Sequence, residues 1–216
     1  MANNRGRPQD PEVQQERKDK LIAVAHRLMK QKSFQNITIR ELAAEAGMQS
    51  AMISYYFGSK EGLFLAMLEE LSVQHFSALK LVTKSDDPLK GFIVTMLGYL
   101  QENDALSRFI IDDIIGEAGM LGKRFIELFP MQMRAFLPTL IEQEQAAGRI
   151  RPELDPQWCA FSLLNMILMP FMAEPVRERA WDISRADICS DAWADHIYNV
   201  FTVGVFDPID NSSKVK

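Results

Sequence analysis

Residues 38–57 read TIRELAAEAGMQSAMISYYF, and this stretch decides the fold. Thr38 offers a capping hydroxyl, and a glutamate follows three residues later, which is the spacing of a capping box at a helix start. A short helix is predicted over residues 39–46, and it ends at Gly47, which can adopt the left-handed conformation common at helix ends. A second short helix is predicted from residue 49 or 50 to residue 56 or 57. Two such helices around a glycine turn form a helix-turn-helix, whose second helix can enter a major groove.

Helices are also predicted on both sides of this stretch. From Glu12 to about Lys32, apolar residues recur at the spacing of one helix face. Ser59 offers a cap for a long helix that follows Gly58. Longer helical segments are predicted over about 60–83, 88–103, 105–117, 121–147, 155–173 and 187–205, and the two prolines at 130 and 138 should kink or split the fourth of them. A strand pattern is confined to short ambiguous runs such as 199–206, so we predict an all-α fold.

The composition is that of an ordinary globular protein. The chain has 216 residues, of which 47% are apolar and 25% charged, and it has a net charge of −5. Cys159 and Cys189 form no disulfide framework or zinc-ligand spacing, so no metal and no cofactor are expected. The N-terminus is polar, and the longest apolar run, residues 161–173, is too short for a membrane-spanning helix. We therefore expect a cytoplasmic protein with no membrane partner.

The charge is divided unevenly along the chain. Residues 1–60 contain ten Lys or Arg and six Asp or Glu, a net charge of +4, whereas residues 61–216 have a net charge of −9. A small basic head on a larger acidic body suggests that the head binds a polyanion.

The predicted second helix has the surface of a DNA reader. The side chains that remain after its inward contacts are small or hydrogen-bonding and nearly uncharged, so they can lie against base edges: Gln49, Ser50, Ala51, Ser54 and Tyr55. Thr38 and Lys60 each lie at a helix start, where backbone amides also favour phosphate, and Tyr56 can offer its hydroxyl to a phosphate. Arg5 and Arg7 in the N-terminal arm either reach a minor groove or belong to a solvated tail.

The stretch TIRELAAEAGMQSAMISYYFGSKEGLFLAML, residues 38–68, resembles the N-terminal DNA-binding domain of the TetR family of bacterial transcriptional regulators. The resemblance includes LIAVAHRLMKQKSFQNIT before it and covers about residues 15–70. The rest of the chain is similar to the family only in architecture and in the phrase AAGRIRPELDP. The resemblance implies a DNA-binding domain over residues 10–58, with the helix-turn-helix at about 38–57. It also implies a larger helical effector-binding and dimerisation domain over residues 59–210.

The resemblance also implies roles for single residues. Thr38, Tyr56 and Lys60 match the family's phosphate contacts, and residues 49–51, 54 and 55 occupy its base-facing positions. Lys or Arg is common in the family where Ser50 stands, Gly where Ala51 stands, and an aromatic residue where Ser54 stands. These departures bear on which operator sequence is read and leave the fold unaffected.

The acidic body is implied to form a homodimer and to bind a hydrophobic small molecule, so that two heads read a roughly palindromic duplex operator. Apolar stripes on the last two long helices are candidates for the dimer interface: Phe161, Leu164, Leu168, Phe171, Trp193, Ile197, Val200 and Phe201. Large or aromatic residues elsewhere are candidates for a ligand pocket: Met96, Tyr99, Phe109, Phe125, Phe129, Met133, Phe136, Trp158 and Met166. Each set can instead belong to plain intrachain core.

Three functions remain open at this point. The first is a DNA-binding regulator, expected to be a repressor released by its ligand, since repression is the family's commoner mode. The second is a helical enzyme, but the sequence contains no Gly-rich phosphate loop, HExxH or GxSxG motif that would supply a catalytic group. The third is a helical protein–protein adaptor that uses the same three-helix head. Salt-dependent binding to duplex DNA separates the first function from the other two.

Overall fold

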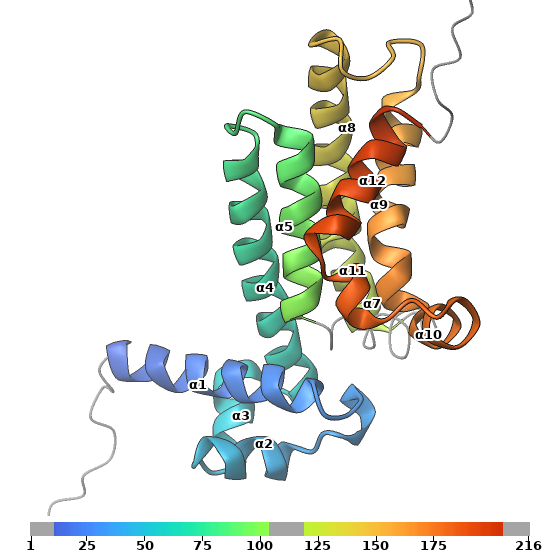
Figure 1. Cartoon of the computed structure of the whole chain (residues 1–216). Coiled ribbons are helices and arrows are strands. Elements are labelled where there is room, and N and C mark those ends of the chain that lie inside the picture. The colour runs from blue at the N-terminus through green and yellow to red at the C-terminus, as the bar shows by residue number, and fades with distance from the viewer. Residues whose placement is uncertain (1–10, 104–118, 205–216) are drawn as a thin grey trace, which may run out of the picture. The chain divides into compact units, whose positions relative to one another are not determined.

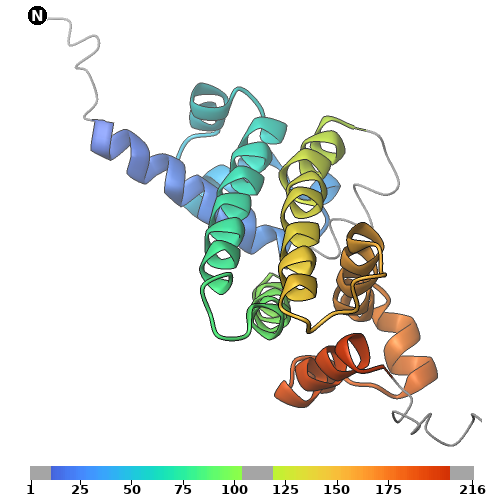
Figure 2. The ribbon, with the colours of Figure 1, turned by 90° about the horizontal axis from the view of Figure 1, so that it is seen from above.

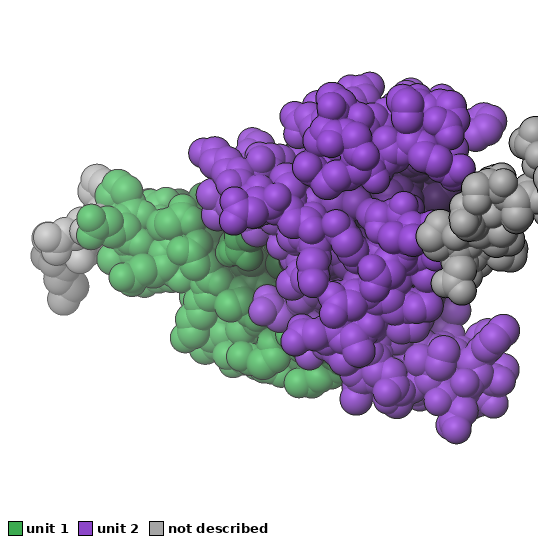
Figure 3. All heavy atoms as spheres, turned by 45° about the horizontal axis from the view of Figure 1, so that its top comes forward, with its two compact units in different colours: residues 1–74, 105–129 green, residues 75–104, 130–216 purple. Residues whose placement is uncertain are grey.

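The computed structural model describes residues 11–103 and 119–204, and every regular element in these ranges is a helix, which confirms the all-α prediction. The chain divides into two compact units, coloured separately in Figure 3. One comprises residues 1–74 and 105–129, and the other residues 75–104 and 130–216. This division lies inside helix α4 (Lys60–Val82), whereas the boundary predicted from the sequence lies just before it.

The first unit begins with three helices and a short 3-10 turn, followed by the first half of α4. They are α1 (Pro11–Met29), η1 (Phe34–Asn36), α2 (Ile39–Ala46) and α3 (Ala51–Phe57). Helix α2 contacts both α1 and α3 (Figure 1). Their inward faces bury a small core completely, because the apolar side chains recur at helical spacing. It includes Leu21, Leu28, Leu42, Ile53 and Phe64.

Helix α7 (Met120–Leu128) belongs to the same unit and is held on α4 by polar contacts. The Ser72 hydroxyl donates a buried hydrogen bond of 2.8 Å to the carbonyl oxygen of Leu128. The Arg124 guanidinium lies 2.8 Å from a carboxylate oxygen of Glu69. Because Ser72 and Glu69 lie one turn apart on α4, the two contacts fix α7 along that helix.

The second unit is a bundle in which α5 contacts α8, α9 and α12 (Figures 1 and 2). These helices are α5 (Pro88–Glu102), α8 (Pro130–Ala146), α9 (Pro156–Met172) and α12 (Asp191–Thr202). Asp87 caps α5, Asp155 caps α9 and Ser190 caps α12, each by accepting a hydrogen bond from a backbone amide of the first turn.

The helices from α7 to α12 can be compared with the segments predicted from the sequence. The predicted segment 121–147 splits at Pro130, as expected for a proline, whereas Pro138 lies inside α8. Helix α10 (Glu174–Trp181) had no counterpart in the prediction, and the predicted helix at 187–205 is divided between α11 (Arg185–Ile188) and α12. The buried Arg177 guanidinium holds the turn around α10 by donating to the carbonyl oxygens of Pro170, at 2.9 Å, and Ile183. The predicted helix at 105–117 lies outside the described residues.

Over residues 11–103 and 119–204, no single helix has both the length and the apolar composition needed to cross a membrane. Helices α9 and α10 have the required length and apolar composition only when they are taken together, and the chain bends by 78° between them.

Candidate DNA-binding surface

The turn between α2 and α3 has the predicted geometry. The Thr38 hydroxyl accepts a hydrogen bond of 3.2 Å from the Glu41 amide, which caps α2. Gly47 has φ +66°, the left-handed conformation that ends the helix, and the Met48 amide then donates 2.8 Å back to the Ala43 carbonyl. These contacts set the direction in which α3 leaves the turn.

Two ion pairs join the basic part of α1 and the turn after it to α2. Arg27 pairs with Glu45, and Lys32 pairs with Glu41. The hydrogen bond from Lys32 is the main reason that the pKa of the Glu41 carboxyl lies below its usual value. Two of the head's cations are thus neutralised within the chain, and they support the helix-turn-helix instead of adding to its positive surface.

The predicted reading residues lie around α3 and its start, and most of their side chains are exposed. Tyr55 is 68% exposed, and Gln49 and Ser54 are also exposed, whereas Ser50 is half-buried. Ala51 completes this surface and is exposed as well. The opposite side of α3 carries Ile53, which is completely buried. The structure therefore brings the five predicted base-facing residues together around one helix, whose outward surface is uncharged and free of bulky branched side chains.

Tyr56 is placed differently from the other predicted contacts. Its ring packs edge-on against Tyr55, with ring centres 5.0 Å apart, and its hydroxyl oxygen is covered and has no hydrogen-bond partner in the described part of the chain. A phosphate contact by this hydroxyl, as predicted, requires the side chain to rotate outward first.

Lys60 is engaged inside the first unit. Its ammonium group donates 3.0 Å hydrogen bonds to the carbonyl oxygens of Phe34 and Ile37, and it lies 4.0 Å from the centre of the Phe34 ring. An ammonium group has three donors, so these bonds leave one for a phosphate. Lys60 consequently has a structural role that the sequence did not reveal, in addition to the predicted phosphate contact.

Further cations in the head received no individual role from the sequence. Lys20 and Arg40 are exposed and Lys18 is half-buried, and none of the three has an ion pair among those that the structure gives for residues 11–103 and 119–204. The ammonium of Lys20 lies 3.9 Å from the position that a side chain on Gly47 would occupy, next to the turn that precedes α3. This location makes Lys20 a candidate phosphate contact. Arg5 and Arg7 lie outside the described residues.

The predicted pocket residues are divided between the two units. Phe125 and Phe129 stack on each other in the first unit, with ring centres 5.0 Å apart, whereas the other described members belong to the second unit. Met96 and Met133 are buried, and Trp158 is 77% exposed. Tyr99, Phe136 and Met166 are half-buried. Phe109 lies outside the described residues.

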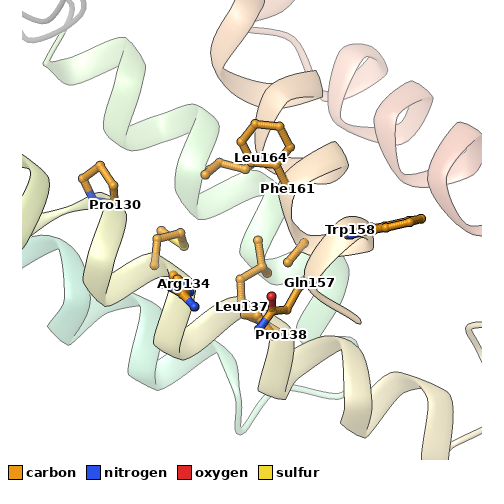
Figure 4. Close-up of a pocket in the computed structure, with 10 residues that line it drawn as sticks. Pro130, Arg134, Leu137, Pro138, Gln157, Trp158, Phe161 and Leu164 are labelled. Atoms are coloured by element: carbon orange, nitrogen blue, oxygen red, sulfur yellow. The ribbon is translucent and has the colours of Figure 1, made fainter. Parts of the chain in front are cut away.

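An apolar groove of about 410 Å³ lies between α8 and α9 (Figure 4). Met133 and Trp158 from the predicted pocket set line it, together with Phe161 and Leu164 from the predicted dimer set. Arg134 and Gln157 supply its polar groups, and the rest of its lining is apolar: Pro130, Leu137, Pro138 and Ala160. The groove therefore joins residues that the sequence had assigned to two different functions.

The predicted dimer residues also separate into two groups. Phe161 is 70% exposed, whereas Phe171 and Ile197 are buried within the chain's own core. These two side chains are therefore not available to a second subunit, and the prediction is corrected for them; α12 packs on α5 and α9, which buries its Ile197. The other members are half-buried: Leu164, Leu168, Trp193, Val200 and Phe201.

No group of three or more His, Cys, Asp or Glu side chains with the geometry of a metal site occurs within the described ranges.

Comparison with known proteins agrees with this geometry. Residues 21–67 match the family model described as "Bacterial regulatory proteins, tetR family". A stretch of 31 residues, 14% of this chain and of the relative, is 64% identical to the HTH-type transcriptional dual regulator CecR of Shigella flexneri. Over 161 residues the chain is 23% identical to the probable HTH-type transcriptional regulator YttP of Bacillus subtilis (strain 168), covering 72% of this chain and 77% of the relative.

The fold extends the similarity beyond the head. The transcriptional regulator FadR from Bacillus subtilis, solved in complex with stearoyl-CoA, superposes with a TM-score of 0.71 at 14% identity, covering 87% of this chain and 99% of that one. The helix-turn-helix, the family model that matches it and the helical neighbours all lead to one conclusion. Residues 21–67 of this chain thus carry the N-terminal helix-turn-helix of the tetR family of bacterial regulatory proteins.

Proposed function

We propose that this protein is a homodimeric DNA-binding repressor that a mainly apolar small molecule releases from a palindromic operator. The observation that carries the proposal is the outward surface of α3 and of the residues at its start, where Gln49, Ser54 and Tyr55 are exposed and the buried Ile53 anchors the helix. Gln can make a bidentate contact to adenine, and Ser can donate to or accept from several bases. Exposed Lys20 and Arg40 supply the positive charge that phosphates require.

Two copies are needed to read a palindrome, and the groove between α8 and α9 supports a contact between them. Trp158 and Phe161 stand on one side of this groove and are largely exposed, at 77% and 70%. Exposed aromatic residues beside an apolar groove are typical of the buried centre of an interface. We therefore assign the groove to a second copy of the chain, with Phe161, Leu164 and Leu168 retained from the predicted interface and Trp158 added to it.

Release by a ligand would be a population shift. A dimer binds the operator when the distance between its two heads matches the distance between successive major grooves on one face of the duplex. A ligand that binds better to a dimer with a different distance between the heads lowers the affinity for DNA. Helix α4 supports such coupling, because it begins at Lys60 in the head and continues into the second unit. The FadR neighbour was solved with stearoyl-CoA, whose acyl part is a long apolar chain.

The proposal is tested by selecting bound duplexes from a random pool and then measuring affinity by fluorescence anisotropy at several salt concentrations. We expect a selected site with two-fold symmetry and an affinity that falls by about 10³-fold or more between 50 and 200 mM salt. Equal affinity for selected and random duplexes with little salt dependence would contradict the proposal and would favour a protein–protein adaptor.

A further inference from the structure

A polar pair lies inside the second unit, between α4 and α5. His75 of α4 is 3% exposed, and its ring centre lies 4.1 Å from that of Tyr99 on α5. Phe76 packs edge-on against His75, and the buried Met96 lies one turn before Tyr99. Two hydrogen-bonding side chains are therefore in contact with each other, with the buried polar residues Ser72 and Asn103 one turn away on α4 and at the end of α5.

The Tyr99 hydroxyl oxygen is covered and makes no hydrogen bond to any residue that the structure describes. A buried hydroxyl without a partner costs free energy, because it has given up its hydrogen bonds to water. Tyrosine is normally buried with a hydrogen-bond partner for its hydroxyl, and phenylalanine would fill the same volume without this cost. An unpartnered, covered hydroxyl on the half-buried Tyr99 thus points to a group that is bound there for part of the time.

The surroundings determine which charge such a group can carry. Burial lowers the pKa of His75 to about 4, so its imidazole is neutral at physiological pH. The charged residues of α5 and of the second half of α4, namely Lys80, Lys90 and Glu102, are exposed. The buried Arg177 has partners of its own, in Pro170 and Ile183. Within the described ranges, no buried cation is therefore available to neutralise an anionic ligand, and a buried carboxylate without a counter-charge is strongly disfavoured.

We propose that the second unit binds an uncharged, mainly apolar molecule with one hydrogen-bonding oxygen, such as a ketone or an alcohol, and that the Tyr99 hydroxyl binds this oxygen. His75 packs against the Tyr99 ring and holds it in place. That this molecule is the effector rests on the proposed function, but the binding itself is independent of DNA.

The first test needs no ligand. Tyr99→Phe removes the unpartnered hydroxyl, so we expect the variant to melt at the same temperature as the wild type or above it. Tyr198→Phe is the matched control, because the Tyr198 hydroxyl forms a hydrogen bond with Asp87, and we expect this variant to melt at a lower temperature. A melting temperature for Tyr99→Phe below that of the wild type would mean that the Tyr99 hydroxyl is already satisfied within the chain, which overturns the proposal.

The second test uses 2-decanone, 1-decanol and decanoate at pH 7.5, with affinity measured by displacement of an apolar fluorescent dye from the full chain. We expect the ketone and the alcohol to bind the wild type more tightly than decanoate, by about ten-fold or more, because the carboxylate must lose its hydration. Tyr99→Phe should weaken ketone binding by about five-fold, the effect of one hydrogen bond, and Tyr198→Phe should not.

Three results would overturn the proposal: decanoate binding as tightly as the ketone, equal ketone affinity in the wild type and Tyr99→Phe, or no binding of either neutral compound. DNA binding by the wild type is measured separately with the selected duplex. Its absence would refute the proposed function and leave the result on ligand chemistry unchanged.

Discussion

Lys60 and Phe34 are joined twice: the Lys60 ammonium donates a 3.0 Å hydrogen bond to the Phe34 carbonyl oxygen and lies 4.0 Å from the centre of the Phe34 ring. The same ammonium donates to Ile37, which directly precedes Thr38, the cap of α2. The start of α4 is thus tied to the segment that leads into the helix-turn-helix. A lysine predicted to bind phosphate also holds the head on the helix that supports it.

Replacing Lys60 with Met should therefore lower the stability of the protein as well as its affinity for DNA. Loss of a charged donor from two carbonyl oxygens should reduce the free energy of unfolding by about 1–3 kcal/mol, measured by urea titration. Lys20→Met is the matched control, since Lys20 is exposed on α1, and its stability should stay close to that of the wild type. Unchanged stability in Lys60→Met would show that the two hydrogen bonds contribute nothing.

Gly47 and Gly98 should respond oppositely to the same substitution. Gly47 has φ +66°, so Gly47→Ala places a side chain in the left-handed region and should destabilise the protein by about 1–2 kcal/mol. Gly98 lies inside α5, and an added Cβ there meets no atom within 4 Å. Gly98→Ala should therefore stabilise the protein by up to about 1 kcal/mol, because alanine favours a helix. Thermal unfolding of both variants measures the difference, and effects of the same sign would refute the argument.

Gln49→Ala should change which base is preferred at one position of each operator half-site. A lost bidentate contact is worth about 1–3 kcal/mol of discrimination, and it is measured by repeating the duplex selection with the variant. Gln35→Ala, at an exposed glutamine of η1, is the matched control and should leave the selected sequence unchanged. An unaltered preference in Gln49→Ala would place that side chain outside the groove.

Trp158→Asp and Phe161→Asp should convert the dimer to a monomer, because each would place a carboxylate in the centre of an apolar interface. Sedimentation velocity measures the oligomeric state. The control is Leu81→Asp, which changes a comparably exposed apolar side chain on α4, far from the groove residues in sequence. A dimer that survives both groove substitutions would mean that a different surface joins the two copies.

His75 should make stability depend on pH below neutrality. Its pKa is lowered to about 4 in the folded protein, so the unfolded chain binds the proton more readily between pH 4 and 6.5. The contribution of the neutral imidazole is therefore present above pH 6.5 and is lost as the pH falls towards 4. From pH 7 to pH 5 the wild type should lose about 2 kcal/mol more than His75→Phe does, measured by urea titration. His196→Phe, at an exposed position of α12, should behave like the wild type.

The local signals of the head were sufficient to predict it. Thr38 with a glutamate three residues later, and Gly47 at the end of the helix, act through bonds within a few residues, so no distant contact is needed to recognise them. The exposure of the predicted base-facing residues followed from the same periodicity, because the buried Ile53 fixes which side of α3 faces outward.

What the sequence could not decide was how each apolar stripe is covered. Phe161 and Phe171 lie on the same helix and have the same chemistry, yet one is 70% exposed and the other is buried. Periodicity tells which residues share a face, whereas the helices packed against that face determine whether it is covered. The position of α12 on α5 and α9 buried Ile197 in this way.

The amino-acid sequence was thus enough to predict the helical class, the helix-turn-helix and its resemblance to the tetR family, because these depend on short-range spacing. Only the tertiary structure decided that Lys60 binds carbonyl oxygens 23 and 26 residues away, that Tyr99 contacts His75, and that α8 and α9 enclose a groove. Each of these features joins segments that are distant along the chain. Such contacts are set by how whole helices pack, and no local pattern records that packing.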